Sequence, residues 1–261
     1  MELVIRPDAD SAAHLVAALI AKALREKPHL VLGLATGRTM ERVYAHLVRM
    51  HKDEGLDFSL CRTFNLDEYI GIPPEHPGSY RFYMNRHLFS QINIDIRNTF
   101  LPNGMASDLK AACRHYEELI AEFGGIDLQL LGIGSDGHIG FNESLSALKS
   151  RTRDKALAPS TIEVNRTLFD DPKEMPMRAI TMGVGTILDA RAILLLVTGS
   201  TKADILAKAV EGPITSMVSA TALQLHPRCR VIVDEHAAVN LQAQAYYRRI
   251  FDTEPEWADF R

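Results

Sequence analysis

The chain has 261 residues, of which 46% are hydrophobic and 24% are charged. This composition supplies enough apolar material for a sizeable core and excludes a mainly disordered protein. The formal net charge of −4 argues against a nucleic acid or an anionic membrane surface as the main partner, because both require a basic footprint.

Short apolar runs, which predict strands, alternate along the chain with longer amphipathic stretches, which predict helices. In chain order we expect a helix at Ser11–Glu26, a strand at His29–Leu34, a helix at Thr39–Lys52, a strand at Thr63–Leu66, helices at Ser79–Phe89 and Ser107–Phe123, strands at Asp127–Gly132, Ala179–Met182 and Ala192–Thr198, a helix at Lys202–Val210, a strand at Arg230–Val233 and a helix at Ala237–Phe251. Apolar strands separated by helices are typical of a mostly parallel sheet with helices on both faces. The sequence therefore predicts an α/β fold, and the lack of a linker predicts one domain over residues 1–261.

The remaining features indicate a cytoplasmic protein without metal. The N-terminal residues MELVIRPDAD lack a signal-peptide pattern, and no apolar run approaches the roughly 18 residues of a membrane span. Cys61, Cys113 and Cys229 form no CxxC pair and suit free thiols in a reducing compartment. The histidines form no HExxH motif. The irregular segment 154–177 is long for a passive loop and predicts a lid or a binding segment.

Two loops that follow predicted strands contain polar groups where a parallel sheet binds ligands. In the first, Gly37, Arg38 and Thr39 lead into a helix, which suits either an anion site or a plain turn with a Thr cap. In the second, Asp67 and Glu68 are adjacent acids, which usually face water or cap a helix but also stand where a general base would be placed.

A third loop, Gly132–Glu143 (GIGSDGHIGFNE), contains four glycines in nine residues. Its glycines permit a tight path, and Asp136 and His138 are two residues apart, so a carboxylate could orient the imidazole and raise its basicity. A glycine-rich loop is a poor place for a core histidine, and no second His or Cys lies near enough in sequence to indicate a metal.

Several long motifs in this order resemble the glucosamine-6-phosphate deaminase (isomerising) family over nearly the whole chain. The motifs are FNLDEYIG (Phe64–Gly71), HPGSY (His76–Tyr80), GIGSDGHIGFNE (Gly132–Glu143), SRTR (Ser150–Arg153), GVGTILDA (Gly183–Ala190) and GSTKA from Gly199. The resemblance implies a modified Rossmann-like fold, no metal and no organic cofactor. It also implies conversion of glucosamine 6-phosphate and water to fructose 6-phosphate and ammonia.

The resemblance also implies residue roles. His138 would open the sugar ring, held by Asp136 and Glu143, and Asp67 would carry a proton between C2 and C1. Gly37, Arg38, Thr39 and Lys202 would bind the phosphate.

Two departures from the family pattern bear on the phosphate. Arg38 replaces a small residue, and Thr167 stands where the family often has a phosphate-binding arginine. We expect Arg38 or Arg166 to supply the missing charge.

Some family members are hexamers that N-acetylglucosamine 6-phosphate activates. Ser146, Arg153 and Lys155 resemble the activator-binding positions, although they could equally be solvated polar groups. A homo-oligomer is accordingly expected.

Other functions stay open from the sequence. Because Arg38 and Thr167 depart from the family pattern, galactosamine 6-phosphate is an alternative substrate. A 6-phosphogluconolactonase-like hydrolase shares the GxGxDGH core, but Asp67 and Glu143 favour the deaminase. A non-catalytic sugar-phosphate sensor is possible on any enzyme fold, and a nucleotide-dependent oxidoreductase is disfavoured because GxGxxG is missing.

Overall fold

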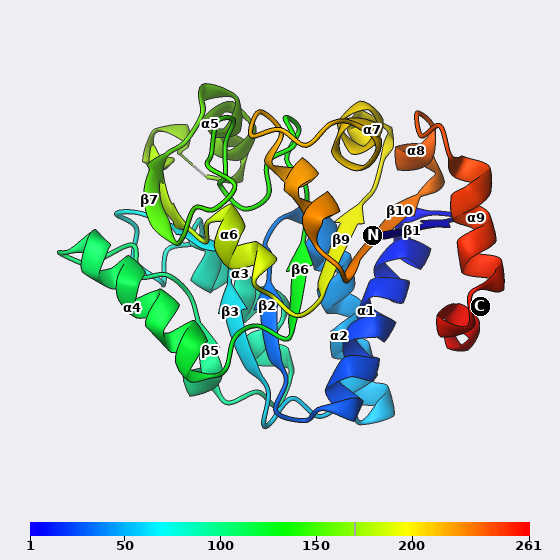
Figure 1. Ribbon diagram of the computed structural model, residues 1–261. Helices are drawn as coiled ribbons and strands as arrows, with labels where there is room; N and C mark the ends of the chain where they lie inside the picture. The colour runs from blue at the N-terminus through cyan, green and yellow to red at the C-terminus, as the bar shows by residue number, and fades with distance from the viewer. Residues whose placement is uncertain (170) are drawn as a thin grey trace.

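A parallel sheet of seven strands forms the centre of the molecule and confirms the predicted α/β fold (Figure 1). The computed structural model describes residues 1–169 and 171–261. The strand order is β1-β10-β9-β6-β2-β3-β5. The strands are β1 (Glu2–Arg6), β2 (Val31–Leu34), β3 (Arg62–Asn65), β5 (Thr99–Phe100), β6 (Leu128–Leu131), β9 (Ile193–Val197) and β10 (Cys229–Asp234).

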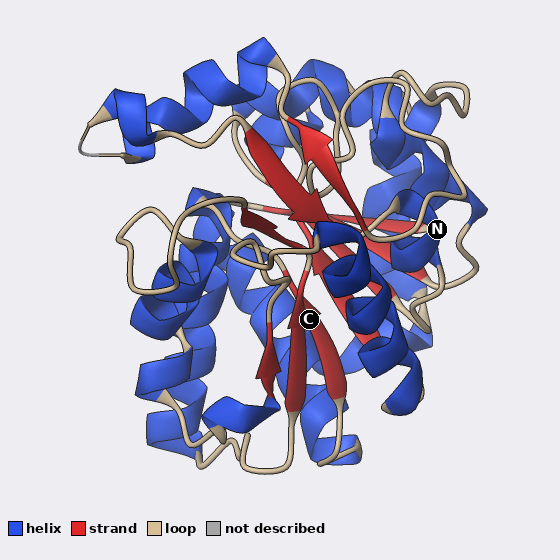
Figure 2. Cartoon of the chain, turned by 90° about the vertical axis from the view of Figure 1, so that its left-hand side faces the viewer, coloured by secondary structure: helices blue, strands red, loops and turns tan. Residues whose placement is uncertain are grey.

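Helices cover both faces of this sheet, as Figure 2 shows. The helices of the described residues are α1 (Ala9–Glu26), α2 (Arg38–Glu54), α3 (Tyr80–His87), α4 (Leu109–Glu122), α5 (Pro159–Asn165), α6 (Val184–Leu188), α7 (Ala203–Glu211), α8 (Glu235–Ala238) and α9 (Gln244–Thr253). Side-chain caps fix where α1 and α4 begin: Asp8 accepts from the Ser11 N–H before α1, and Asp108 accepts from the Ala111 N–H before α4. The helix boundaries therefore follow local chemistry.

A second, antiparallel sheet of three strands lies beside the first, in the order β4-β8-β7. Its strands are β4 (Asp67–Tyr69), β7 (Arg153–Ala156) and β8 (Arg178–Thr181). The strand expected at Ala179–Met182 exists, but its expected place in the parallel sheet was wrong because it pairs with β4 and β7 instead. The strand's apolar run indicated burial without indicating its partners.

The helix expected at Ala237–Phe251 was also wrong, since α8 and α9 are separate helices. The carboxylate of Glu211 accepts hydrogen bonds from the backbone N–H groups of Gln242 and Ala243. These N–H groups are satisfied by a side chain rather than by a continuing helix, so the chain turns between the two helices.

Three neighbouring strands, β6, β2 and β3, precede the three loops that the sequence singled out. Their ladders are parallel, with Gly33 of β2 opposite Phe64 of β3 on one side and Gln129 of β6 on the other. Their carboxyl ends therefore lie along one edge of the sheet, and the three loops meet there.

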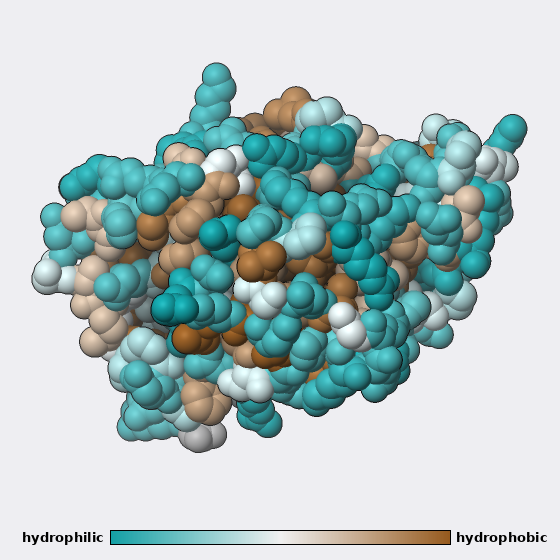
Figure 3. Space-filling model, turned by 90° about the horizontal axis from the view of Figure 1, so that it is seen from below, coloured by the Kyte–Doolittle hydropathy of each residue, from teal (hydrophilic) through white to brown (hydrophobic). Residues whose placement is uncertain are grey.

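The outer surface is mixed in character. On the face seen in Figure 3, hydrophobic residues show mainly near the middle and are surrounded by hydrophilic ones. Within residues 1–169 and 171–261, no helix has the length and apolar character needed to cross a membrane.

Candidate active site

A cavity of about 640 Å³ opens where the loops after β2, β3 and β6 meet. It brings together most of the site residues expected from the sequence. Those that line it are Gly37, Arg38, Thr39, Asp67, His138 and Lys202.

Asp67 and Glu68 point to opposite sides of β4, because successive side chains alternate along a strand. Asp67 and Tyr69 line the cavity, whereas Glu68 does not. The Asp67 side chain reaches the cavity from a position where the residue is only 6% exposed, and no described residue donates a hydrogen bond to its carboxylate. Burial, followed by the nearby charge of Glu68, raises the pKa of Asp67 to about 8.

His138 lies between two carboxylates. Its Nδ1 is 2.6 Å from Oδ1 of Asp136 and 3.4 Å from Oε2 of Glu143. Burial by itself lowers the pKa of His138, but the two carboxylates outweigh burial and raise this pKa to about 9. In return, His138 holds the pKa of Asp136 well below its usual range. Because Nδ1 faces the acids, Nε2 is the nitrogen left to exchange protons with a ligand in the cavity.

Glycines allow the loop after β6 to pass this close to the reactive groups. A Cβ on Gly134 would lie 2.4 Å from the His138 ring. Gly140 has φ +56°, and a Cβ there would lie 2.9 Å from Oγ1 of Thr181 and 3.4 Å from Oδ2 of Asp67. The glycine-rich pattern therefore makes room for His138 and Asp67.

Glu143 also connects the site to the segment that the sequence marked as irregular. Its Oε1 accepts hydrogen bonds from Oγ1 of Thr161 (2.7 Å) and from the Ala158 N–H (3.1 Å) at the start of α5. The other oxygen, Oε2, faces His138. Of the expected segment 154–177, Asp170 lies outside the described residues, while Thr161 and Asn165 on α5 line the cavity.

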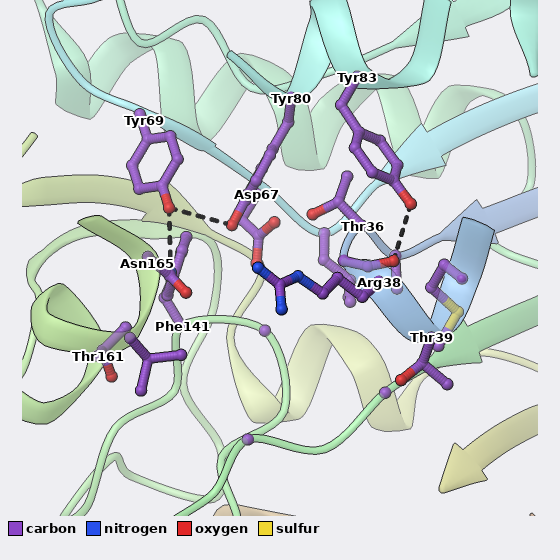
Figure 4. Close-up of a pocket in the computed structure, with 18 of the residues that line it drawn as sticks. Thr36, Arg38, Thr39, Asp67, Tyr69, Tyr80, Tyr83, Phe141, Thr161 and Asn165 are labelled. Carbon is purple, nitrogen blue, oxygen red and sulfur yellow. Dashed lines mark hydrogen bonds between the residues drawn. The ribbon is translucent and has the colours of Figure 1, made fainter. Parts of the chain in front are cut away.

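An aromatic wall that the sequence did not reveal closes one side of the cavity (Figure 4). The rings of Tyr80 and Phe141 stack at 6.0 Å with an interplanar angle of 11°. The Tyr69 hydroxyl accepts a hydrogen bond from Nδ2 of Asn165 at 3.0 Å and lies 3.4 Å from the Tyr80 hydroxyl. Tyr80 belongs to the HPGSY motif, which was the available sequence signal, although nothing in the motif assigned it to the site.

The first loop presents the N-terminus of α2 to the cavity. Gly37 has φ +114°, a backbone conformation that L side chains rarely adopt, and its carbonyl accepts a hydrogen bond from the Tyr83 hydroxyl at 2.8 Å. Arg38 is exposed and lines the cavity, where Figure 4 shows its side chain extending from the loop. Burial lowers the pKa of Lys202 at the same cavity. Arg38, Lys202 and the N-terminus of α2 thus line the same cavity. This arrangement of positive charge favours the binding of an anion there.

The other expected residues lie elsewhere. Arg166 is not among the residues that line the cavity, and its Nη1 pairs with Oε2 of Glu163 at 2.9 Å. Nη2 of Arg153 donates to Oγ of Ser146 at 3.1 Å, so these two expected activator residues do meet. Lys155 is exposed on β7.

The donor atoms of Asp136, His138 and Glu143 all lie within 4.8 Å of one another, a set that could in principle hold a cation. Ligands about 2.0–2.2 Å from a tetrahedral zinc are separated by more than 3 Å. The separation of 2.6 Å between His138 and Asp136 is instead suited to a shared proton.

Comparisons with known proteins show which family this chain resembles. Residues 8–232 match the family model described as glucosamine-6-phosphate isomerases/6-phosphogluconolactonase. A glucosamine-6-phosphate deaminase from Arthrobacter sp. (strain FB24) is 47% identical over 257 residues, which are 98% of this chain and 99% of the relative. One from Hahella chejuensis (strain KCTC 2396) is 50% identical over 248 residues, 95% of each chain.

Solved structures extend the likeness to three dimensions. A monomeric glucosamine-6-phosphate deaminase aligns with a TM-score of 0.90 and 42% identity, covering 92% of this chain and 100% of its own. A 6-phosphogluconolactonase from Trypanosoma cruzi aligns with a TM-score of 0.73 and 20% identity, covering 92% and 97%, and shares the fold.

Proposed function

The chain belongs to the family of glucosamine-6-phosphate isomerases and 6-phosphogluconolactonases, and from this premise we propose that it is an isomerising deaminase. The proposed reaction converts glucosamine 6-phosphate and water to fructose 6-phosphate and ammonia. Amino-sugar catabolism is the proposed setting.

One observation carries this proposal: a buried carboxylate and a histidine held by two other carboxylates face the same cavity. Asp67 has its pKa raised to about 8, mainly by burial, and His138 has its pKa raised to about 9 by its two acids against the opposing effect of burial. An isomerisation needs both a base and an acid near one carbon pair. Asp67 and His138 supply this pair.

In the proposed mechanism, His138 donates a proton from Nε2 to the ring oxygen, the bond between C1 and the ring oxygen breaks, and the C1 hydroxyl returns its proton to Nε2, which leaves the aldehyde. Asp67, when ionised, then takes the proton from C2 and returns it to C1, while Nε2 of His138 protonates the oxygen on C1. The product of this transfer is a protonated imine at C2 with a hydroxyl on C1. Water adds to C2 and gives one proton back to Nε2. The new C2 hydroxyl passes its proton to the nitrogen as the C2–N bond breaks, so ammonia leaves and the ketose remains.

The phosphate is proposed to bind at Gly37, Arg38 and Thr39 together with Lys202. The first N–H groups of α2 point toward such a group, and the two cations balance its charge. Arg166 is left out of this proposal because it pairs with Glu163 outside the cavity lining.

The alternatives explain fewer of the site's features. A lactonase needs only to activate water, so it has no use for a second buried base such as Asp67. A sensor gains nothing from burying a carboxylate without hydrogen-bond donors, which lowers the stability of the folded state. Galactosamine 6-phosphate differs from the proposed substrate in one hydroxyl configuration and is the second candidate substrate.

Four further assignments complete the proposal. The chain works as one domain with α5 and its neighbours as a cover, and it assembles as a homo-oligomer. N-acetylglucosamine 6-phosphate binds near Ser146, Arg153 and Lys155 as an activator. The three buried free cysteines suit a reducing cytoplasm.

An isotope experiment tests the proposed function and mechanism together. Glucosamine 6-phosphate labelled with deuterium at C2 is incubated with the purified protein, and the ketose product is analysed by mass spectrometry. Deuterium at C1 of fructose 6-phosphate is expected, since one carboxylate carries the proton. Absence of a ketose product would overturn the proposed function.

A further inference from the structure

We propose that Glu68 is a positioning residue: it fixes the helix that presents Tyr80 to the cavity, and its carboxylate places a negative charge behind Asp67. This inference rests on the proposed function, in which Asp67 is the base. Glu68 itself does not line the cavity.

The hydrogen bonds of Glu68 define its positioning role. Its Oε1 accepts from the backbone N–H groups of Tyr69 (2.8 Å) and Tyr80 (2.9 Å), and its Oε2 accepts from that of Arg81 (2.9 Å). Tyr80 and Arg81 are the first two residues of α3, whose N–H groups have no partner inside the helix. Glu68 thus ties α3 to β4 at the strand that carries Asp67.

Burial raises the pKa of Glu68, which is only 5% exposed, and the same contacts oppose this rise by favouring the ionised form. A carboxylate that accepts several backbone hydrogen bonds is favoured in its ionised form. No ion pair to Glu68 forms among the described residues, because the Arg81 guanidinium instead donates to Oγ1 and the carbonyl of Thr99. The negative charge, one residue from Asp67, therefore has no direct ion-pair partner among the described residues, and Arg81 stabilises it only from a greater distance.

Five groups near Asp67 bear on its ionisation. Glu68 opposes ionisation of Asp67, and His138 on the loop after β6 favours it. Three buried tyrosines lie close enough for the charge of Asp67 to raise the pKa of each, namely Tyr69 on β4, Tyr80 on α3 and Tyr116 on α4. The tyrosines stay neutral in the working range because burial raises the pKa of each. Glu68 is thus the charged group that keeps protons on Asp67.

The test compares Glu68→Gln with Ser79→Ala. The amide removes the charge of Glu68 but retains an oxygen for the Tyr69 and Tyr80 N–H groups. Ser79 caps the same helix, accepting from the Phe82 N–H at 3.0 Å, and carries no charge. Ser79→Ala is therefore the matched control for a weakened helix start.

In Glu68→Gln the acidic limb of the kcat/KM profile is expected to move to lower pH by about one unit, since a neighbouring like charge is removed. In Ser79→Ala this limb is expected to stay at its wild-type pH, whatever happens to kcat. A wild-type acidic limb in Glu68→Gln, or an equal shift in both variants, would overturn the proposal.

A second measurement is independent of turnover. The aspartate carboxyl carbons are labelled with 13C, and the resonance lost in Asp67→Asn is titrated by NMR. Its midpoint is expected to be lower in Glu68→Gln than in the wild type, and an unchanged midpoint would overturn the proposal. If the wild type releases no ammonia, the proposed function fails, while this titration still decides the role of Glu68.

Discussion

Nδ1 of His138 lies 2.6 Å from Oδ1 of Asp136, so one carboxylate fixes the orientation of the imidazole and stabilises its charged form. Glu143 adds a second acid at 3.4 Å from the same nitrogen. The opposite nitrogen is then free to act on a sugar in the cavity, which makes His138 the acid of the proposed reaction.

Replacement of His138 tests this role directly. His138→Gln is expected to lower kcat by about 10²–10⁴-fold, the usual contribution of a general acid–base group. Loss of ammonia release is measured at saturating substrate, and circular dichroism checks that the variant is folded. A kcat within a few-fold of the wild type would remove His138 from the mechanism.

The pH profile of the wild type depends on two groups. Asp67 must be ionised to act as base, so kcat/KM is expected to fall below its pKa of about 8. His138 must be protonated to act as acid, so kcat/KM is expected to fall above its pKa of about 9. The profile should be a narrow bell with its maximum between these values, because kcat/KM reports the free enzyme.

Asp136→Asn provides the control for the alkaline limb. Removing the closest carboxylate lowers the pKa of His138, so that limb should move to lower pH while the acidic limb stays in place. An alkaline limb that does not move would show that it belongs to another group.

Asp67→Asn is expected to abolish activity and yet stabilise the fold at high pH. In the folded protein the pKa of Asp67 is raised from 3.8 to about 8, so the folded state binds more protons than the unfolded state between these values. The contribution of Asp67 to stability therefore falls as pH rises through this range, and an amide avoids the fall.

Melting temperatures of wild type and Asp67→Asn at several pH values check this expectation. The variant's advantage should be small near pH 4 and largest above pH 8, where a charged Asp67 is buried. An advantage that is the same at every pH would mean that the ionisation of Asp67 does not affect stability.

Arg38→Ala tests the proposed phosphate site. A hydrogen bond to a charged group contributes about 1.5–3 kcal/mol, which corresponds to a KM roughly 10–100-fold higher with little change in kcat. Arg166→Ala is the matched control, because Arg166 is a partly exposed arginine that does not line the cavity. A raised KM in the control together with an unchanged KM in Arg38→Ala would reverse the assignment.

Chelation tests the assignment of Asp136, His138 and Glu143 to proton transfer. Prolonged dialysis against EDTA is expected to leave ammonia release unchanged, since the 2.6 Å contact between His138 and Asp136 is too short for two ligands of one tetrahedral zinc. Activity that is lost on dialysis and restored by a divalent metal would contradict this assignment.

The main sheet could be predicted from sequence because β2 and β9 are apolar along their whole length, and β6 and β10 are apolar over most of theirs. The shorter strands could not, since β5 has two residues and β7 is polar. β4 begins at Asp67, only one residue after β3 ends at Asn65, so no turn signal in the sequence separates the two strands. The pairing of β4 with β8 joins residues more than 100 apart, for which no local pattern exists.

For the site, too, the sequence indicated residues that lie close together along the chain and missed residues that only the fold brings together. The glycine-rich loop indicated Asp136, His138 and Glu143 together because they lie on one short segment. Tyr80 and Phe141 were missed because an aromatic residue in a cavity wall and one in the core look alike in sequence. The opposite directions of Asp67 and Glu68 became visible only once β4 was known to be a strand.

Ammonia release by the purified protein is the most direct test of the central claim. Glucosamine 6-phosphate, galactosamine 6-phosphate and 6-phosphogluconolactone are assayed side by side, with ammonia and fructose 6-phosphate measured for the first. Equal amounts of ammonia and fructose 6-phosphate from glucosamine 6-phosphate are expected. No ammonia from either amino sugar, together with hydrolysis of the lactone, would contradict the account.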